Sequence, residues 1–176
     1  MKKEKDIKNR KFKDKGFSLI EILVAVLVFS MIAVVTGQSL SSSLRSSKKS
    51  ESIGKVRENI EYVMNFMERK LRSAKSLDCI NSNVNNLIYQ AVSGQSAYFL
   101  CDNTSKSIIY NSGLNDHVIN SSDVEIVCGN VFRNISCPGQ GEPDSVDIEI
   151  TGGDKYTLGS ESYSYTARTK ILLRNY

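Results

Sequence analysis

A nineteen-residue, largely apolar run, Phe17–Val35, limits what this 176-residue chain can fold into more than any other feature. As an α-helix it would rise about 28 Å, which matches a bilayer hydrocarbon core of about 30 Å. Eight of the sixteen preceding residues are Lys or Arg, and such residues mark the cytoplasmic end of a span. We therefore predict one transmembrane helix, with everything after residue 35 outside the cytoplasmic (inner) membrane.

A secretory signal peptide is the main alternative, because it also begins with a basic region. Its apolar region usually has about 7–15 residues and ends at a cleavage site of small residues. The run here is longer, contains Glu21, and offers only a poor cleavage site at residues 35–37. A retained span is the better interpretation.

Glu21 is the only charged residue in the run. A carboxylate inside a span costs about 2.5–3.5 kcal/mol even on mild insertion scales, so it needs a partner. Cleavage between Gly16 and Phe17 would create an α-ammonium one helical turn before Glu21, or beside Glu21 of a neighbouring subunit. The alternative is that Glu21 lies close enough to the cytoplasmic interface to reach water.

The segment Lys15–Glu21 (KGFSLIE), between a short basic leader and an apolar helix, resembles the processing signal of type IV prepilins and pseudopilins. The resemblance implies that a prepilin peptidase cleaves after Gly16 and methylates the amino group of Phe17. Residues 1–16 would then be a cytoplasmic leader that is removed. It also implies that Glu21 sets the register of each subunit in a filament, where a neighbour's ammonium can neutralise a buried acid.

The helix is expected to continue beyond the span as an amphipathic helix over residues 36–78. No Pro occurs before residue 138, and apolar residues recur at spacings of three and four, the period of an amphipathic helix. Ser39–Ser50 contains seven Ser and is the weakest part of this helix; a flexible linker there is the alternative. The recurring apolar residues are Ile53, Val56, Ile60, Val63, Met67, Leu71 and Ala74.

Residues 79–176 consist of short segments rich in Val, Ile and Tyr, bounded by Asn, Ser, Gly and Asp, which is the pattern of strands and turns. Their apolar face needs cover, which the helix stripe can supply. The predicted fold class is therefore α+β and pilin-like: a long N-terminal helix packed on a mainly antiparallel β head outside the membrane. The predicted strands are Leu87–Val92, Ser96–Cys101, Lys106–Asn111, Val124–Cys128, Val131–Ile135, Ser145–Thr151, Lys155–Leu158 and Tyr163–Leu173.

All four cysteines, Cys79, Cys101, Cys128 and Cys137, lie in this head, where an extracytoplasmic location permits disulfides. Three pairings are open, and closeness in sequence favours Cys79 with Cys101 and Cys128 with Cys137. Reduced core thiols are one alternative. A zinc site is another, but the chain has no C-x-x-C pair with a nearby His.

The sequence contains no nucleophile, phosphate-binding or metalloprotease motif. His117 is the only histidine and lies in a polar loop. An acidic stretch could in principle hold Ca²⁺, but it lacks EF-hand spacing and partly alternates along a predicted strand, which favours a solvated strand face. We therefore expect neither an enzyme nor a cofactor nor a metal site. The acidic residues are Glu142, Asp144, Asp147, Glu149 and Asp154.

The predicted function is that of a minor pilin or pseudopilin that helps to initiate or cap a type IV pilus-like filament. Residues 61–74, 143–150 and 171–175 resemble the J-type pseudopilins of type II secretion and the W-type minor pilins, which implies a priming or tip role. The expected partners are the prepilin peptidase, other major and minor pilins or pseudopilins, the pilus assembly platform and the membrane. The expected location is the membrane first, and then the pilus or pseudopilus at the cell surface.

Two other functions remain open: a membrane-anchored adhesive module and a competence pseudopilin for DNA uptake. Direct nucleic-acid binding is not expected, because residues 76–176 contain six basic and eleven acidic residues and phosphate contacts require a basic surface.

Overall fold

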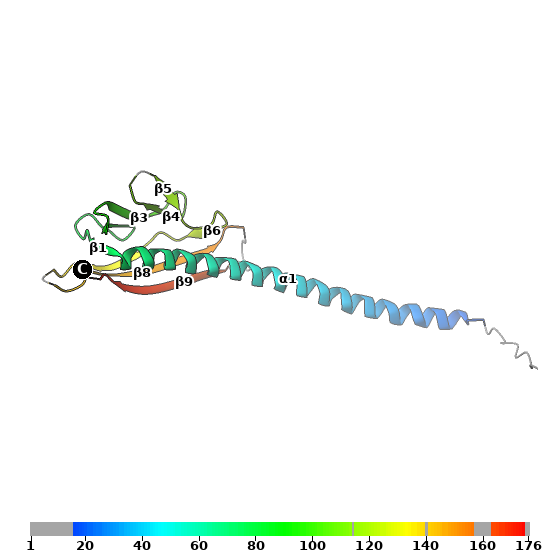
Figure 1. Ribbon diagram of the computed structural model, residues 1–176. Coiled ribbons are helices and arrows are strands. Elements are labelled where there is room, and N and C mark those ends of the chain that lie inside the picture. The colour runs from blue at the N-terminus through cyan, green and yellow to red at the C-terminus, as the bar shows by residue number, and fades with distance from the viewer. Residues whose placement is uncertain (1–15, 114, 140, 157–162, 175–176) are drawn as a thin grey trace, which may run out of the picture. The chain divides into compact units, whose positions relative to one another are not determined.

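The computed structural model describes residues 16–113, 115–139, 141–156 and 163–174. The chain divides into two compact units, Met1–Arg45 and Ser46–Tyr176, which are described separately. One helix, α1 (Leu19–Arg72), begins in the first unit and ends in the second (Figure 1). Among the described residues α1 is the one helix long and apolar enough to cross a membrane, and its most apolar part is fully exposed.

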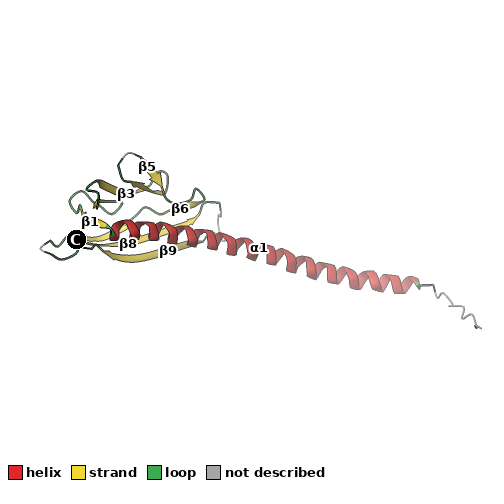
Figure 2. Ribbon diagram, viewed as in Figure 1, coloured by secondary structure: helices red, strands yellow, loops and turns green. Residues whose placement is uncertain are grey.

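The second unit contains two antiparallel sheets, which lie along the C-terminal part of α1 (Figure 2). In sheet A the strand order is β1-β2-β3-β4-β5. In sheet B the long strand β8 pairs with β6 and β7 along one edge and with β9 along the other. The strands are β1 (Ala74–Leu77), β2 (Asn86–Ala91), β3 (Ser96–Asp102), β4 (Ser107–Asn111), β5 (Asp116–Val118), β6 (Val124–Ile126), β7 (Phe132–Ser136), β8 (Ser145–Asp154) and β9 (Ser164–Leu172).

The apolar stripe of α1 packs against both sheets in one core. Ile60 and Leu71 of the helix, Phe99 of sheet A and Ile150 of sheet B are all fully buried. Burial of such side chains contributes about 1.5–3 kcal/mol each, before entropy costs. The predicted stripe is thus confirmed at Val56, Ile60, Val63, Met67 and Leu71, and the α+β fold class is confirmed with it.

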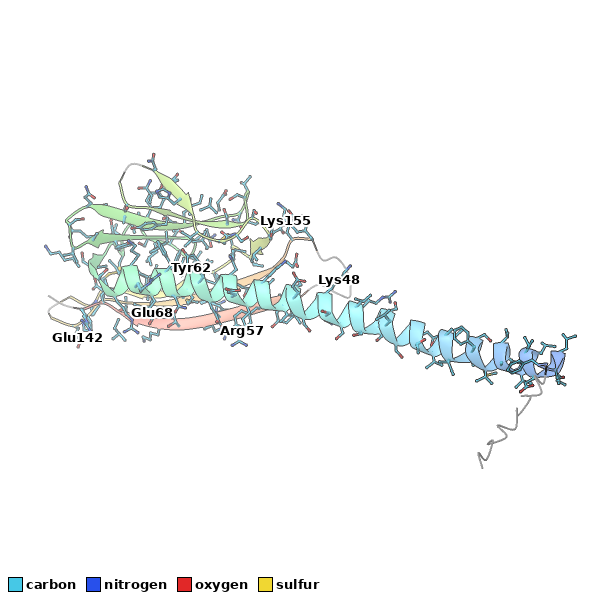
Figure 3. All side chains as sticks on the ribbon, turned by 45° about the vertical axis from the view of Figure 1, so that its right-hand side comes forward. Lys48, Arg57, Tyr62, Glu68, Glu142 and Lys155 are labelled. Carbon is cyan, nitrogen blue, oxygen red and sulfur yellow. A yellow bond between two sulfur atoms is a disulfide. The ribbon has the colours of Figure 1, made fainter. Side chains whose placement is uncertain are left out.

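The exposed side of this helical part is charged. Arg57 and Glu61 form an i, i+4 pair at 2.8 Å, and Arg57 also lies over the Tyr165 ring of β9. The Arg57 guanidinium lowers the pKa of Glu61. Figure 3 shows Arg57, Tyr62 and Glu68 on the part of α1 that runs alongside the sheets. Because this side of α1 is charged, only the opposite, apolar face of the helix is buried in the core.

Helix α1 ends at Arg72, six residues earlier than predicted. The Ser73 hydroxyl donates to the carbonyls of Arg69 (3.2 Å) and Lys70 (2.9 Å), which satisfies two acceptors of the last turn. Ala74 then begins β1, which pairs with β2. Ala74 suits the apolar stripe of a helix and a buried position in a strand equally well. The spacing of the apolar residues alone therefore could not show where the helix ends.

Seven of the eight predicted strands are confirmed, with boundaries that differ by up to three residues. The eighth is not: Lys155 and Tyr156 lie outside the strands, and residues 157 and 158 lie outside the described residues. The structure adds β1 and β5, which were not predicted. All three residues of β5 are exposed, so it carries no apolar alternation that a sequence could reveal.

Two disulfides are confirmed, but the favoured pairing is wrong. The bridges join Cys79 to Cys137 and Cys101 to Cys128, with Cα–Cα distances of 6.3 and 5.5 Å. One bridge links the loop after β1 of sheet A to the segment after β7 of sheet B, and the other links β3 of sheet A to the segment after β6 of sheet B. The pairing therefore follows the contact between sheets and not closeness in sequence.

Two hydrogen bonds, one between backbone groups and one from a backbone N–H to a side chain, explain why these cysteines meet. The Ile126 N–H of β6 donates to the Lys106 carbonyl at 2.8 Å, which holds β6 beside the β3–β4 connection. The Leu77 N–H of β1 donates to Asp144 Oδ2 at 2.8 Å, which joins the end of β1 to the start of β8. The first contact brings Cys128 to β3, and the second brings Cys79 to the segment after β7.

Removing the buried bridge should weaken the head strongly. Cys101 is 3% exposed and belongs to the core, and loss of a native disulfide from a small domain costs about 2–5 kcal/mol. We expect C101A/C128A to lower the free energy of unfolding by this amount in denaturant titrations. The control is the reduced wild-type chain, which should lose at least as much stability; an unchanged midpoint for the variant would contradict the expectation.

Candidate processing and assembly site

The site begins with three residues outside any helix, Gly16 to Ser18, immediately before α1. The Ser18 carbonyl accepts hydrogen bonds from the N–H groups of Glu21 (3.0 Å) and Ile22 (3.3 Å). Ser18 is therefore the N-cap residue, and Glu21 is at the third helical position. The basic leader, residues 1–15, lies outside the described residues.

Ser18 and Glu21 together make the S-x-x-E pattern of a capping box. Glu21 is also the acid in the first turn of α1, where a negative charge interacts favourably with the positive end of the helix dipole. Sequence reasoning missed this local role, although the spacing of Ser18 and Glu21 could have revealed it. Glu21 therefore suits the start of a helix independently of any neighbouring subunit.

The fold does not require glycine at position 16. A Cβ atom built on Gly16 meets nothing within 4 Å, and the residue has no positive φ that would favour glycine. The following Phe17 side chain is 76% exposed. Any requirement for glycine at this position must therefore come from another molecule.

Glu21 is not a member of any of the six ion pairs between described residues. Three other acids of α1, Glu51, Glu61 and Glu68, have a cation one turn away, as Glu51 has Lys55 at 2.9 Å. Within the described residues, the interaction left to the Glu21 charge is the one with the start of its own helix.

Polar side chains inside the apolar part of α1 bond to their own helix. Hydroxyl groups of Ser30, Thr36 and Ser39 donate to carbonyls three or four residues earlier, at 2.8 Å, 2.9 Å and 3.0 Å. Such bonds satisfy hydroxyl donors without water. This part of α1 can therefore lie in lipid or among other apolar helices despite its serine and threonine.

Four of the five acids considered for Ca²⁺, Asp144, Asp147, Glu149 and Asp154, have hydrogen-bond or ion-pair partners within the second unit. Glu149 on β8 accepts from Arg133 at 2.9 Å and from Arg168 at 3.0 Å. Asp147 accepts from Asn134, and Asp154 accepts from the Ser52 hydroxyl of α1. Asp144 accepts from the Leu77 N–H, as described above. Glu142 precedes β8 and Lys155 follows it, so the two lie beyond opposite ends of the strand (Figure 3).

His117 lies on the exposed strand β5. The neighbouring Asp116 accepts from Asn111 Nδ2 and from the Tyr98 hydroxyl, both at 2.7 Å. These two hydrogen bonds lower the pKa of Asp116. The acid beside His117 thus serves to hold β5 against β4. Across the described residues, no cluster of three or more His, Cys, Asp or Glu side chains could hold a metal ion.

Residues 11–37 match the family described as the prokaryotic N-terminal methylation motif. The matched segment contains Gly16, Phe17 and Glu21 and supports a type IV pilin-like or pseudopilin-like subunit. The motif implies processing by a prepilin peptidase and assembly with other pilins. The exposed apolar helix is consistent with membrane anchoring. No curated protein and no solved structure matches the chain.

Proposed function

We propose that this chain is a minor pilin or pseudopilin that is cleaved after Gly16, methylated on Phe17, and assembled into a type IV pilus-like filament with Glu21 in the register contact. The observation that carries the proposal is the position of the methylation motif. The Gly16–Phe17 bond lies outside the helix and immediately before its cap, and exposed apolar side chains follow.

Cleavage creates a positive charge that the Glu21 carboxylate can offset. Hydrolysis of the Gly16–Phe17 bond leaves a carboxylate on the leader and an ammonium on Phe17. That ammonium lies at the positive end of the α1 dipole, which disfavours a cation. Glu21, in the first turn, carries the charge that offsets both the ammonium and the dipole, within one subunit or between two.

The proposed topology places the leader in the cytoplasm and the head outside. Eight basic residues in the leader favour retention on the cytoplasmic side. Two disulfides in the head suit an oxidising, extracytoplasmic compartment. The priming or tip role rests on the resemblance of three segments to J-type pseudopilins and W-type minor pilins.

Mass spectrometry of the mature N-terminus tests the proposal directly. We expect the first residue to be Phe17 with one added methyl group, and an unprocessed chain in cells without the prepilin peptidase. A mature chain that begins near residue 37 would identify a conventional signal peptide. A chain that keeps residues 1–16 in peptidase-containing cells would identify a simple anchor.

A further inference from the structure

The two disulfides are nested along the chain. Cys79 pairs with Cys137, 58 positions away, and this loop encloses the bridge from Cys101 to Cys128, which are 27 positions apart. Cysteines that are consecutive in sequence lie closer: 22 positions separate Cys79 from Cys101, and nine separate Cys128 from Cys137. The native bridges are therefore not the ones that an unfolded chain closes most readily.

Loop closure quantifies this preference. The closure free energy grows as (3/2)RT ln n, so contact frequency falls as the −3/2 power of the separation. In the unfolded chain Cys79 meets Cys101 about four times as often as it meets Cys137. Cys128 likewise meets Cys137 about five times as often as it meets Cys101.

The direction of export adds to this preference, a step that rests on the proposed topology. The chain leaves the membrane from its N-terminal side, so Cys79 and Cys101 are outside before Cys128 is. If the chain emerges at the rate of synthesis, about 5–20 residues per second, Cys79 and Cys101 are outside for about 1–5 s before Cys128 follows. The first bridge to form in an oxidising compartment is then the non-native one between Cys79 and Cys101.

A chain with both consecutive bridges cannot correct itself. Disulfides exchange by attack of a thiolate on a sulfur, and all four sulfurs of that chain are already bonded. We propose that this protein is a substrate of an extracytoplasmic thiol–disulfide isomerase, which supplies the missing thiolate and produces the nested pairing.

Three exchanges complete the correction. The partner thiolate attacks Cys79 Sγ, forms a mixed disulfide and releases the Cys101 thiolate. Cys101 then attacks Cys128 Sγ, forms the native inner bridge and releases the Cys137 thiolate. Finally, Cys137 attacks Cys79 Sγ and returns the partner's thiolate. Each step breaks one S–S bond and forms one, so no electrons are gained or lost overall.

The positions of the sulfurs agree with this order. Cys101 is 3% exposed in the core, whereas Cys137 is exposed and Cys79 is half-buried. Both outer cysteines line a surface hollow of about 590 Å³. Ile80, on the rim of the hollow, is 93% exposed and offers an apolar contact. The bridge that closes last is thus the one a partner can reach in the nearly folded head.

Oxidative refolding of the full chain tests the proposal. The reduced chain, held in non-ionic detergent micelles, is refolded in a glutathione redox buffer with or without protein disulfide isomerase. Samples are quenched with acid and mapped as non-reduced peptides. We expect an early species with Cys79 bonded to Cys101, and native bridges that form about tenfold faster with the isomerase. Equal rates, or no such early species, would overturn the proposal.

A matched variant separates mispairing from other effects. C79A/C137A retains Cys101 and Cys128, which can form only the native inner bridge. Its oxidation rate should change less than twofold on addition of the isomerase, and a tenfold change would overturn the proposal. Because refolding in micelles involves neither processing nor filament entry, its result is independent of the mass-spectrometric test of the proposed function.

Discussion

A chain with Gly16→Val is expected to keep its leader and to be absent from filaments. The structure leaves open space around position 16, so valine should not disturb α1 or the head. The substitution should instead obstruct a peptidase pocket that accepts glycine, and we expect cleavage to fall about 100-fold. The measurement is the mass of the membrane-bound chain, together with its abundance in sheared filaments.

The retained leader explains why filament entry should fail as well. It contains eight basic and three acidic residues. Moving a charged side chain through the bilayer centre costs about 2.5–3.5 kcal/mol even on mild scales, so a subunit with this leader should stay in the membrane. Gly37→Val is the matched control, because position 37 also faces open space but lies inside α1. Normal cleavage of Gly16→Val would remove the assigned role of Gly16.

The fold was largely predictable because its main contacts follow a local period. Val56, Ile60 and Val63 recur at spacings that place them on one helical face, and the same face is buried. Alternation in β8 likewise predicted which residues point into the core, as at Ile148 and Ile150. In these patterns each apolar residue marks a buried position, so the buried face of a helix or strand can be predicted from a single sequence.

The disulfide pairing was not predictable for the opposite reason. It depends on which sheet meets which, and closeness in sequence carries no information about that contact. The bond from the Ser52 hydroxyl to Asp154 has the same character, since it joins residues 102 positions apart. The start of α1 at the N-cap Ser18 lay within reach of sequence reasoning, because the capping-box pattern is local.

Glu21→Gln should abolish or greatly reduce filaments while leaving the subunit processed, inserted and folded. Glutamine is nearly isosteric and is accepted at the third position of a capping box, so the start of α1 should be preserved. Loss of the charge should also relieve the cost of an acid in the membrane. In a filament, however, the change removes the partner of the Phe17 ammonium, and breaking one side of a buried ion pair costs about 3–5 kcal/mol. The measurement is the number of filaments per cell and the recovery of other pilins with the variant.

Two controls make this result specific to the charge at position 21. Glu51→Gln also removes an acid from α1. The side chains of Glu51 and its partner Lys55 are both largely exposed, and exposed ion pairs contribute about 0–1 kcal/mol. Filament number should therefore remain normal. Glu21→Asp keeps the charge on a shorter side chain and should restore part of the assembly that glutamine loses. Wild-type filament number with Glu21→Gln, together with unchanged recovery of other pilins, would show that the apolar helix acts as an anchor and that Glu21 has no part in subunit register.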